Sequence, residues 1–273
     1  MNKKTIILAV AGAALVAGSQ AQAQVAYNNE DLLLDFRNTA ATSDADVTVD
    51  LGQVSTFASQ AASSTVQLNV GAGAQFTQSE LLSAFGGSLA SVGFTAAAGD
   101  NVSDTTWITR VVATPSLNAP TPVSAQPTLA NAITTVNQIG QVGVGAALGT
   151  GVTAFGSANG SIVASGNAES YQNEATPSGE PANLNFRGLN TAGGAGGPLE
   201  NITTGANIVY SALWEVPHSG QSLSDEYLGY FTFNGATGEI DFTAVPEPST
   251  YGVLAASGLL ALALRRQYRA LNA

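Results

Sequence analysis

The sequence predicts a mainly β fold, either an antiparallel β-sandwich or a curled sheet, with one or two short helices packed on it. Two observations predict this class. Segments with strand character outnumber those with helical spacing, and most alternate apolar and polar side chains, as half-buried strands do. The loop Asn234–Gly238, rich in turn-forming residues, separates two such segments and predicts a hairpin.

The first two predicted strands differ in pattern. Residues 27–37 contain three consecutive leucines followed by Phe36, which predicts a buried strand. Residues 46–51 alternate strictly and predict a half-buried strand. Its apolar face holds Val47, Val49 and Leu51, and we expect Asp46, Thr48 and Asp50 to face solvent.

A helix and two strands follow. The helix is predicted over residues 75–85, with Thr77 or Ser79 as its N-cap and Leu81, Leu82 and Phe85 on its apolar face. Strands are predicted over 92–95 and 106–113, with a turn at Asp100-Asn101. Four prolines within residues 114–127 indicate a surface connection rather than a boundary between domains.

A second helix is predicted over residues 128–141, with Leu129, Ile133, Val136 and Ile139 on one face. Residues 143–197 are rich in glycine, alanine and serine, and we expect mobile loops there with two short strands. Three further strands are predicted over 208–216, 227–233 and 239–244.

Composition excludes several classes of site. The 273 residues contain no cysteine and one histidine, so disulfides, thiolate zinc sites, cysteine nucleophiles and histidine-rich metal sites are ruled out. The net charge is −11, and the only basic side chains between Gln24 and Pro248 are Arg37, Arg110 and Arg187. Nucleic-acid binding needs a basic surface and is therefore not expected. We expect no cofactor.

The N-terminus has the pattern of a secretory signal peptide. Lys3 and Lys4 precede an uncharged apolar run over residues 5–18. Ala21 and Ala23 then form the small-x-small site that signal peptidase reads, so we expect residues 1–23 to be removed and the mature chain to begin at Gln24. A permanent anchor is the alternative, but the apolar run is short for a membrane span.

The C-terminus consists of three consecutive blocks within residues 245–273. Val245, Pro246, Glu247, Pro248, Ser249 and Thr250 form a proline-containing motif, in which two prolines exclude regular secondary structure. Residues 251–264 are uncharged and predict a short transmembrane helix, and Arg265, Arg266 and Arg269 form a basic tail. The basic residues at both ends place the acidic middle, residues 24–244, outside the inner membrane.

This arrangement resembles the PEP-CTERM sorting signal, whose bearers are substrates of exosortase, a membrane-embedded transpeptidase-like protease of Gram-negative bacteria. The resemblance implies that exosortase acts within Val245–Ser249 and that the helix is then discarded. It also implies an association with exopolysaccharide and biofilm formation. The segments DLLLDFR, DVTVDLG, WITR and YLGYFTFNGATGEIDFTAVPEPS further resemble PEP-CTERM proteins of bacteria such as Verrucomicrobia, with Asp35 where glycine is expected. That resemblance implies no catalytic residues.

Three groups of side chains are candidate sites. Asp44, Asp46 and Asp50 are weak calcium candidates without the glycine and closing glutamate of an EF-hand, and a solvated strand face is the favoured interpretation. Glu215, Asp225 and Glu226 are the candidate glycosidase carboxylates. His218 with Ser219 or Ser222 is a poor catalytic candidate, because triad members meet in space rather than along the chain.

The strand aromatics form a fourth group. A sugar-stacking platform is one interpretation, and core packing is the favoured one, for Trp107, Trp214, Tyr210, Tyr227 and Tyr230.

The sequence therefore predicts a non-enzymatic envelope or extracellular-matrix protein, briefly held in the inner membrane, cut by signal peptidase and exosortase, and delivered to the surface or the polysaccharide matrix. A carbohydrate-binding module and an envelope hydrolase are the alternatives.

Overall fold

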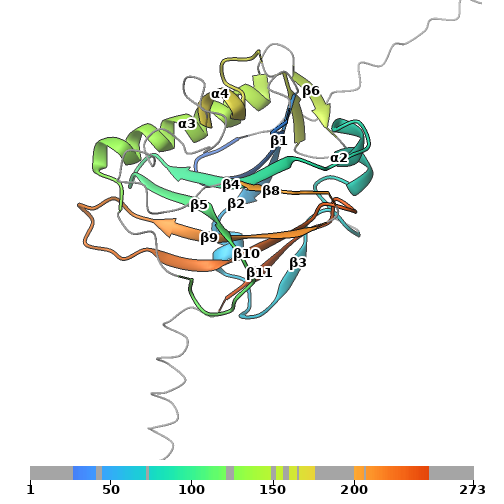
Figure 1. The fold of residues 1–273 in the computed structure, drawn as a ribbon. Coiled ribbons are helices and arrows are strands. Elements are labelled where there is room, and N and C mark those ends of the chain that lie inside the picture. The colour runs from blue at the N-terminus through green and yellow to red at the C-terminus, as the bar shows by residue number, and fades with distance from the viewer. Residues whose placement is uncertain are drawn as a thin grey trace, which may run out of the picture.

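Eleven strands form one antiparallel sheet in the computed structural model, which describes residues 27–40, 45–71, 74–120, 126–148, 152–155, 160–164, 166–175, 200–205 and 207–245. The strands are β1 (Asp31–Asn38), β2 (Asp46–Gln53), β3 (Thr65–Gln67), β4 (Val92–Asp100), β5 (Thr105–Val112), β6 (Val152–Phe155), β7 (Gly160–Val163), β8 (Asn201–Ile202), β9 (Ile208–Val216), β10 (Glu226–Asn234) and β11 (Ile240–Ala244). Their order is β3-β11-β10-β9-β5-β4-β1-β2-β7-β6, and β8 pairs with β4. The predicted mainly β, antiparallel class is confirmed (Figure 1).

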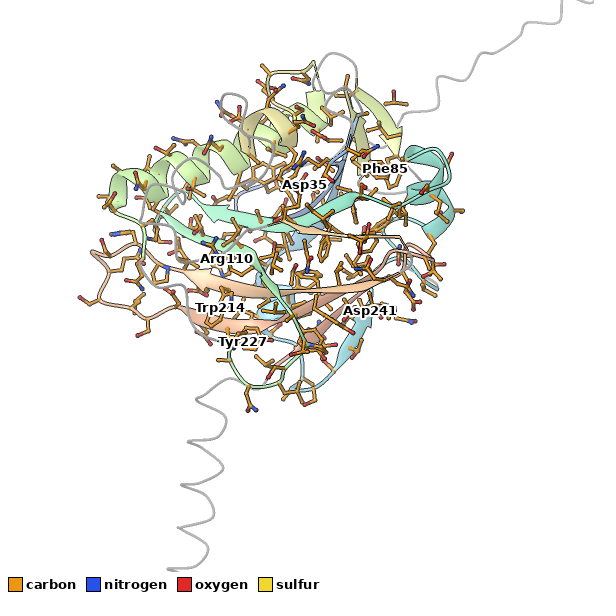
Figure 2. All side chains as sticks on the ribbon, in the orientation of Figure 1. Asp35, Phe85, Arg110, Trp214, Tyr227 and Asp241 are labelled. Carbon is orange, nitrogen blue, oxygen red and sulfur yellow. The ribbon has the colours of Figure 1, made fainter. Side chains whose placement is uncertain are left out.

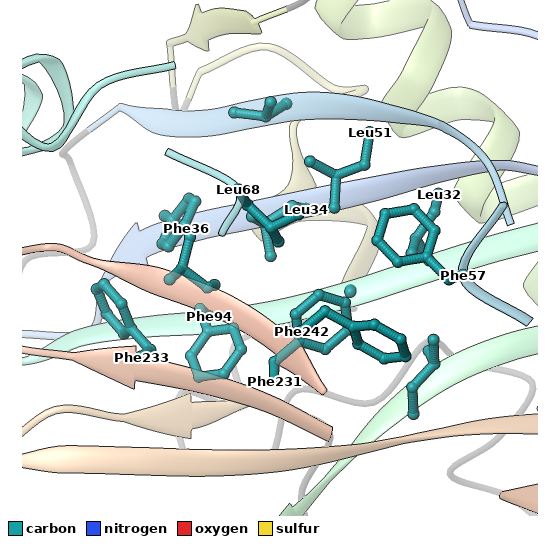
Figure 3. Packing of buried hydrophobic residues seen from close by; sticks show 14 of the residues in the cluster. Leu32, Leu34, Phe36, Leu51, Phe57, Leu68, Phe94, Phe231, Phe233 and Phe242 are labelled. Atoms are coloured by element: carbon teal, nitrogen blue, oxygen red, sulfur yellow. The ribbon is translucent and has the colours of Figure 1, made fainter. Parts of the chain in front are cut away.

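The sheet curls so that its two halves enclose an apolar core. Strands β1 and β10 are separated by β4, β5 and β9 in the sheet order. The ring centroids of Phe36 on β1 and Phe233 on β10 are nevertheless 5.4 Å apart. Phe94 on β4 lies 5.3 Å from the same Phe233 ring. These contacts across the curl bring the halves together in an inner core, to which Leu34, Phe231 and Phe242 also belong (Figure 3).

Helices cover part of the outer face of the sheet (Figure 1). Helix α3 (Leu129–Leu148) and helix α4 (Tyr171–Ala175) pack there over a second apolar cluster. It includes Leu33, Ala97 and Ile108 from the strands and Ile139 and Val142 from α3. The alternation along β1 therefore serves two cores, because Leu32 and Leu34 face inward while Leu33 faces the helices.

Helix α3 differs from its prediction in both length and buried face. It continues to Leu148, through a glycine- and alanine-rich stretch expected to be a mobile loop. Leu129 and Ile133 are 47% and 40% exposed, so the predicted apolar face was wrong at these two positions. The face that packs on the sheet contains Ala132, Val136, Ile139, Val142 and Ala146.

The remaining elements are short. Helix α2 (Gln78–Ala84) is capped by Thr77, whose hydroxyl accepts a hydrogen bond from the Glu80 backbone N–H while the Glu80 carboxylate accepts one from the Thr77 backbone N–H. Helix α1 (Ser55–Ala58) buries Phe57 and was not predicted, nor were α4, β3 and β8. The two short strands expected within residues 143–197 are present as the β6–β7 hairpin.

Candidate functional site

The folded domain ends directly beside the predicted sorting motif. Strand β11 pairs with β10 up to the Gly229–Ala244 register pair. The next residue, Val245, is still buried, and its backbone N–H donates to the Leu228 carbonyl at 3.1 Å. The described fold therefore reaches the first residue of the motif.

A buried polar cluster lies at one end of the outer face, where β1 and β2 meet α4. We define it as Asp35 and Arg37 of β1, Asp46 of β2, Tyr171 of α4, and Glu200. Figure 2 shows Asp35 within this region. All five side chains are at most 5% exposed. The cluster therefore holds three carboxyl groups and one guanidinium away from solvent.

Arg37 and Glu200 are the strongest pair in this cluster. Arg37 Nε donates to Glu200 Oε1 at 2.9 Å, and Arg37 Nη2 donates to Glu200 Oε2 at 2.8 Å. Gly93 stands opposite Arg37 on β4, and a methyl group there would lie 2.3 Å from the Glu200 carboxyl carbon. A glycine is therefore needed at this position for the Glu200 carboxylate to lie against the sheet.

In each of the two aspartates of the cluster, Asp35 and Asp46, one carboxyl oxygen accepts a hydrogen bond and the other does not. Asp35 Oδ1 accepts from the Thr48 hydroxyl at 2.6 Å, and Asp46 Oδ2 accepts from the Gln172 backbone N–H at 2.7 Å. Asp35 Oδ2 and Asp46 Oδ1 are buried without a hydrogen-bond partner within the described part of the chain. A buried carboxylate that lacks hydrogen bonds is costly in its ionised form, so burial favours the protonated form of Asp35 and Asp46.

Burial raises the pKa of all three carboxyl groups in the buried polar cluster. It raises the pKa of Asp35 to about 8, and the nearby Asp46 and Glu200 carboxylates add to this shift. It raises the pKa of Asp46 to about 7, against the opposing effects of its hydrogen bonds and of Arg37. Burial also raises the pKa of Glu200 to about 7, although Arg37 favours its ionised form.

Comparison with known protein families matches residues 244–267 to the PEP-CTERM protein-sorting motif. The chain carries a PEP-CTERM sorting motif. The motif indicates a protein that is exported, transiently anchored in the membrane through its C-terminus, and processed by exosortase. No match was found among curated proteins or among solved structures. The motif covers the end of the chain, and the β domain before it is characterised by its structure alone.

The residues predicted to be recognised during processing lie outside the described ranges, except for Val245. Outside the described ranges lie the predicted signal-peptidase residues Ala21, Ala23 and Gln24, the motif residues Pro246, Glu247, Pro248 and Ser249, and the basic residues Arg265, Arg266 and Arg269. The domain boundaries 1–23 and 24–244 therefore stay predictions. Among the helices that the structure describes, none is long and apolar enough to span a membrane.

The calcium candidates take a different environment from the one predicted. Asp44 is outside the described residues. Asp46 and Asp50 are buried, so the prediction that they face solvent was wrong. The reason is that α3 and α4 cover this strand face, a tertiary contact that the alternation within β2 does not encode. No metal-binding group of three or more His, Asp or Glu side chains is present in the ranges described.

The candidate glycosidase carboxylates are partly brought together. Glu215 and Glu226 are register partners on β9 and β10, which places them directly opposite one another. Glu215 also accepts a hydrogen bond from the Trp107 indole N–H at 3.0 Å. Asp225 instead accepts from the Gln126 side chain at 3.1 Å.

The candidate His218 makes a local contact, in which its Nδ1 accepts a hydrogen bond from the Gly220 backbone N–H of the same turn at 3.1 Å.

Most of the candidate sugar-stacking aromatics belong to the core. Trp107, Trp214 and Tyr227 are buried, and the Trp214 and Tyr227 ring centroids are 5.2 Å apart (Figure 2). Tyr210 and Tyr230 are half-buried on the neighbouring strands β9 and β10. The five aromatics therefore do not form one exposed platform.

The buried polar cluster was missed by the sequence reasoning. Its members come from four separate segments, and Glu200 is 163 residues from Arg37 in the chain. A signal was nonetheless present, because Asp35 and Arg37 flank Phe36 directly after three consecutive leucines. Charged side chains in such a strand indicate a buried ion pair or a covered second face.

Proposed function

We propose that this protein is a non-enzymatic component of the cell envelope or extracellular matrix, delivered there by exosortase processing and associated with exopolysaccharide. The observation that carries the proposal is the position of the PEP-CTERM motif relative to the fold. Because pairing ends at Ala244 and Val245 is the last described buried residue, a cut within 246–250 removes no described element of the domain. Processing would then release the β domain intact.

The charge of the described surface supports an extracellular role and limits the partner. The described ranges contain no lysine, and their two arginines, Arg37 and Arg110, are only 2% and 6% exposed. An anionic polymer would therefore meet acidic groups without exposed lysine or arginine side chains to bind it. A neutral polysaccharide fits this surface better.

Intact mass and terminal peptide mapping of the protein from its own host test the processing. Material from the envelope and the medium should begin at Gln24 and end within residues 245–250. Replacing Pro246, Glu247 and Pro248 together by alanine should leave the tail attached, whereas Leu223→Ala, an exposed change in the domain, should be processed normally. Wild-type protein that still ends at Ala273 would contradict exosortase processing.

Fractionation of the same cultures tests the matrix association. The processed protein should co-purify with the exopolysaccharide, and it should become freely soluble in a strain that makes none. Equal distribution of the protein in both strains would contradict the proposed association.

The opposed pair Glu215 and Glu226 favours one alternative, an envelope hydrolase. This alternative predicts glycan turnover that Glu215→Gln or Glu226→Gln abolishes. The non-enzymatic proposal predicts no turnover of matrix glycans by the wild-type protein. Turnover that depends on either glutamate would replace our proposal with the hydrolase.

A further inference from the structure

A polar groove with no role assigned so far lies along helix α3. Its volume is about 430 Å³, within the range of small-ligand pockets. The polar side chains that line it are Tyr27, Asn29, Asn101, Asn137, Gln141 and Glu169. Val136 and Val144 add apolar surface.

Two glycines of α3 allow residues of the groove wall to lie directly against the helix. A methyl group at Gly143 would lie 2.3 Å from Tyr27 Cγ, so the tyrosine ring rests directly on the helix. A methyl group at Gly145 would lie 2.6 Å from the Glu169 carbonyl oxygen. Glycine within a helix costs about 1 kcal/mol relative to alanine. Here that cost accompanies the close approach of two groove-lining residues.

The hydrogen-bonding groups of the groove include both fixed and available ones. Asn29 is held in place, because its Nδ2 donates to Asp100 Oδ1 and its Oδ1 accepts from the Asn101 backbone N–H, both at 2.9 Å. The Asn101 and Asn137 amides and the Glu169 carboxylate make no side-chain hydrogen bond within the described residues. These groups can therefore bind a ligand without losing a protein contact.

The chemistry of the lining matches a sugar. Each hydroxyl of a saccharide both donates and accepts, and so do amide side chains, while Glu169 is an additional acceptor. Tyr27 and the two valines offer apolar contact for the C–H face of a pyranose ring. No Lys, Arg or His lines the groove, so an acidic sugar would have no counter-charge.

We propose that this groove binds a neutral saccharide unit of an extracellular polysaccharide. The proposal rests on the proposed matrix function, for which it names the ligand class and the contact surface. Asn101 and Asn137 supply the amide contacts, and Tyr27 supplies the stacking surface. Gln141 borders the groove with its amide turned to donate to the Glu174 carboxylate at 3.0 Å.

Nuclear magnetic resonance titration of the ¹⁵N-labelled processed protein tests the groove. The probes are neutral hexasaccharides of glucose, mannose and galactose, with a uronic acid hexamer as the anionic comparison. At least one neutral hexamer should shift the side-chain amide signals of Asn101, Asn137 and Gln141, and the uronic acid hexamer should shift none of them. The absence of shifts with every neutral hexamer at millimolar concentration would overturn the proposal, as would preferential binding of the uronic acid.

Two variants show whether binding occurs at the groove. Asn101→Ala combined with Asn137→Ala changes two exposed positions and should weaken binding at least tenfold. Leu129→Ala, an exposed change two turns away on the same helix, should bind as the wild type does. Unchanged affinity of the double variant, or shifts centred on Tyr210 and Tyr230, would place binding elsewhere and reject the groove.

The groove and the matrix function can fail separately. If the wild-type protein co-purifies with exopolysaccharide but no neutral hexamer reaches the groove, the groove proposal is rejected and the function stands. If the wild-type protein does not co-purify with exopolysaccharide, the proposed matrix function is rejected whatever the groove binds.

Discussion

The Glu200 carboxylate binds the Arg37 guanidinium through two short hydrogen bonds in the protein interior, and it reaches Arg37 across the bare backbone of Gly93. Both side chains are about 3% exposed. A buried ion pair of this kind is costly to break because one uncompensated charge remains. The two residues therefore fix the segment that precedes β8 against the middle of the sheet.

Gly93→Ala should destabilise the protein strongly. The new methyl group would occupy the position of the Glu200 carboxyl group and leave Arg37 buried without its partner. We expect a loss of about 3 kcal/mol in the free energy of unfolding, measured by urea denaturation. Gly166→Ala is the control, because a methyl group there meets nothing within 4 Å. Equal stability of both variants would mean that Glu200 can move aside freely.

Stability should fall as the pH rises from about 4 to about 8. The pKa values of Asp35, Asp46 and Glu200 are raised to about 8, 7 and 7 in the folded state. Between the unfolded values near 4 and these folded values, the folded state binds more protons. Raising the pH therefore favours unfolding, which denaturation curves at pH 5, 7 and 9 would show. A stability that increases over this interval would contradict the assignment.

Asp35→Asn should flatten that pH dependence. The asparagine mimics the protonated acid, and its carbonyl oxygen can still accept the Thr48 hydrogen bond. We expect the variant to lose less stability than the wild type between pH 5 and pH 9. Parallel slopes for Asp35→Asn and the wild type would exclude Asp35 as a titrating group.

Thr77→Ala should weaken helix α2. It removes the hydroxyl that accepts from the Glu80 backbone N–H. Loss of such a cap costs about 1 kcal/mol in the free energy of unfolding. Ser83→Ala, an exposed change within the same helix, should be neutral or slightly stabilising because alanine has the higher helix propensity. Denaturation of both variants under one condition makes the comparison, and a neutral Thr77→Ala would contradict the cap.

Phe233→Ala should be among the most damaging changes in the inner core. Phe233 contacts Phe36 and Phe94 from the opposite half of the curled sheet. Truncation of a buried phenylalanine costs about 3–5 kcal/mol. Val102→Ala, at an exposed turn position, should leave the melting temperature unchanged. A small loss for Phe233→Ala would mean that the two halves of the sheet are held together elsewhere.

Most strand positions could be predicted because their signals are local. The alternation in β2 and the turn residues between β10 and β11 depend only on neighbouring residues. The same locality explains the error at Asp46 and Asp50. Alternation separates the two faces of a strand, but whether the second face meets water or a helix depends on distant segments. Helix α4, which covers Asp46, begins 125 residues after it in the chain.

The candidate sites divide in the same way. The PEP-CTERM motif is formed by consecutive residues, so the sequence alone indicates exosortase processing. The strand segments and the absence of cysteine also follow from the sequence alone. Three features are visible only in the tertiary structure: the curl that brings Phe36 to Phe233, the Arg37–Glu200 pair, and the groove on α3. Each depends on residues far apart in the chain, and their proximity is a property of the packed sheet and helices rather than of any local pattern.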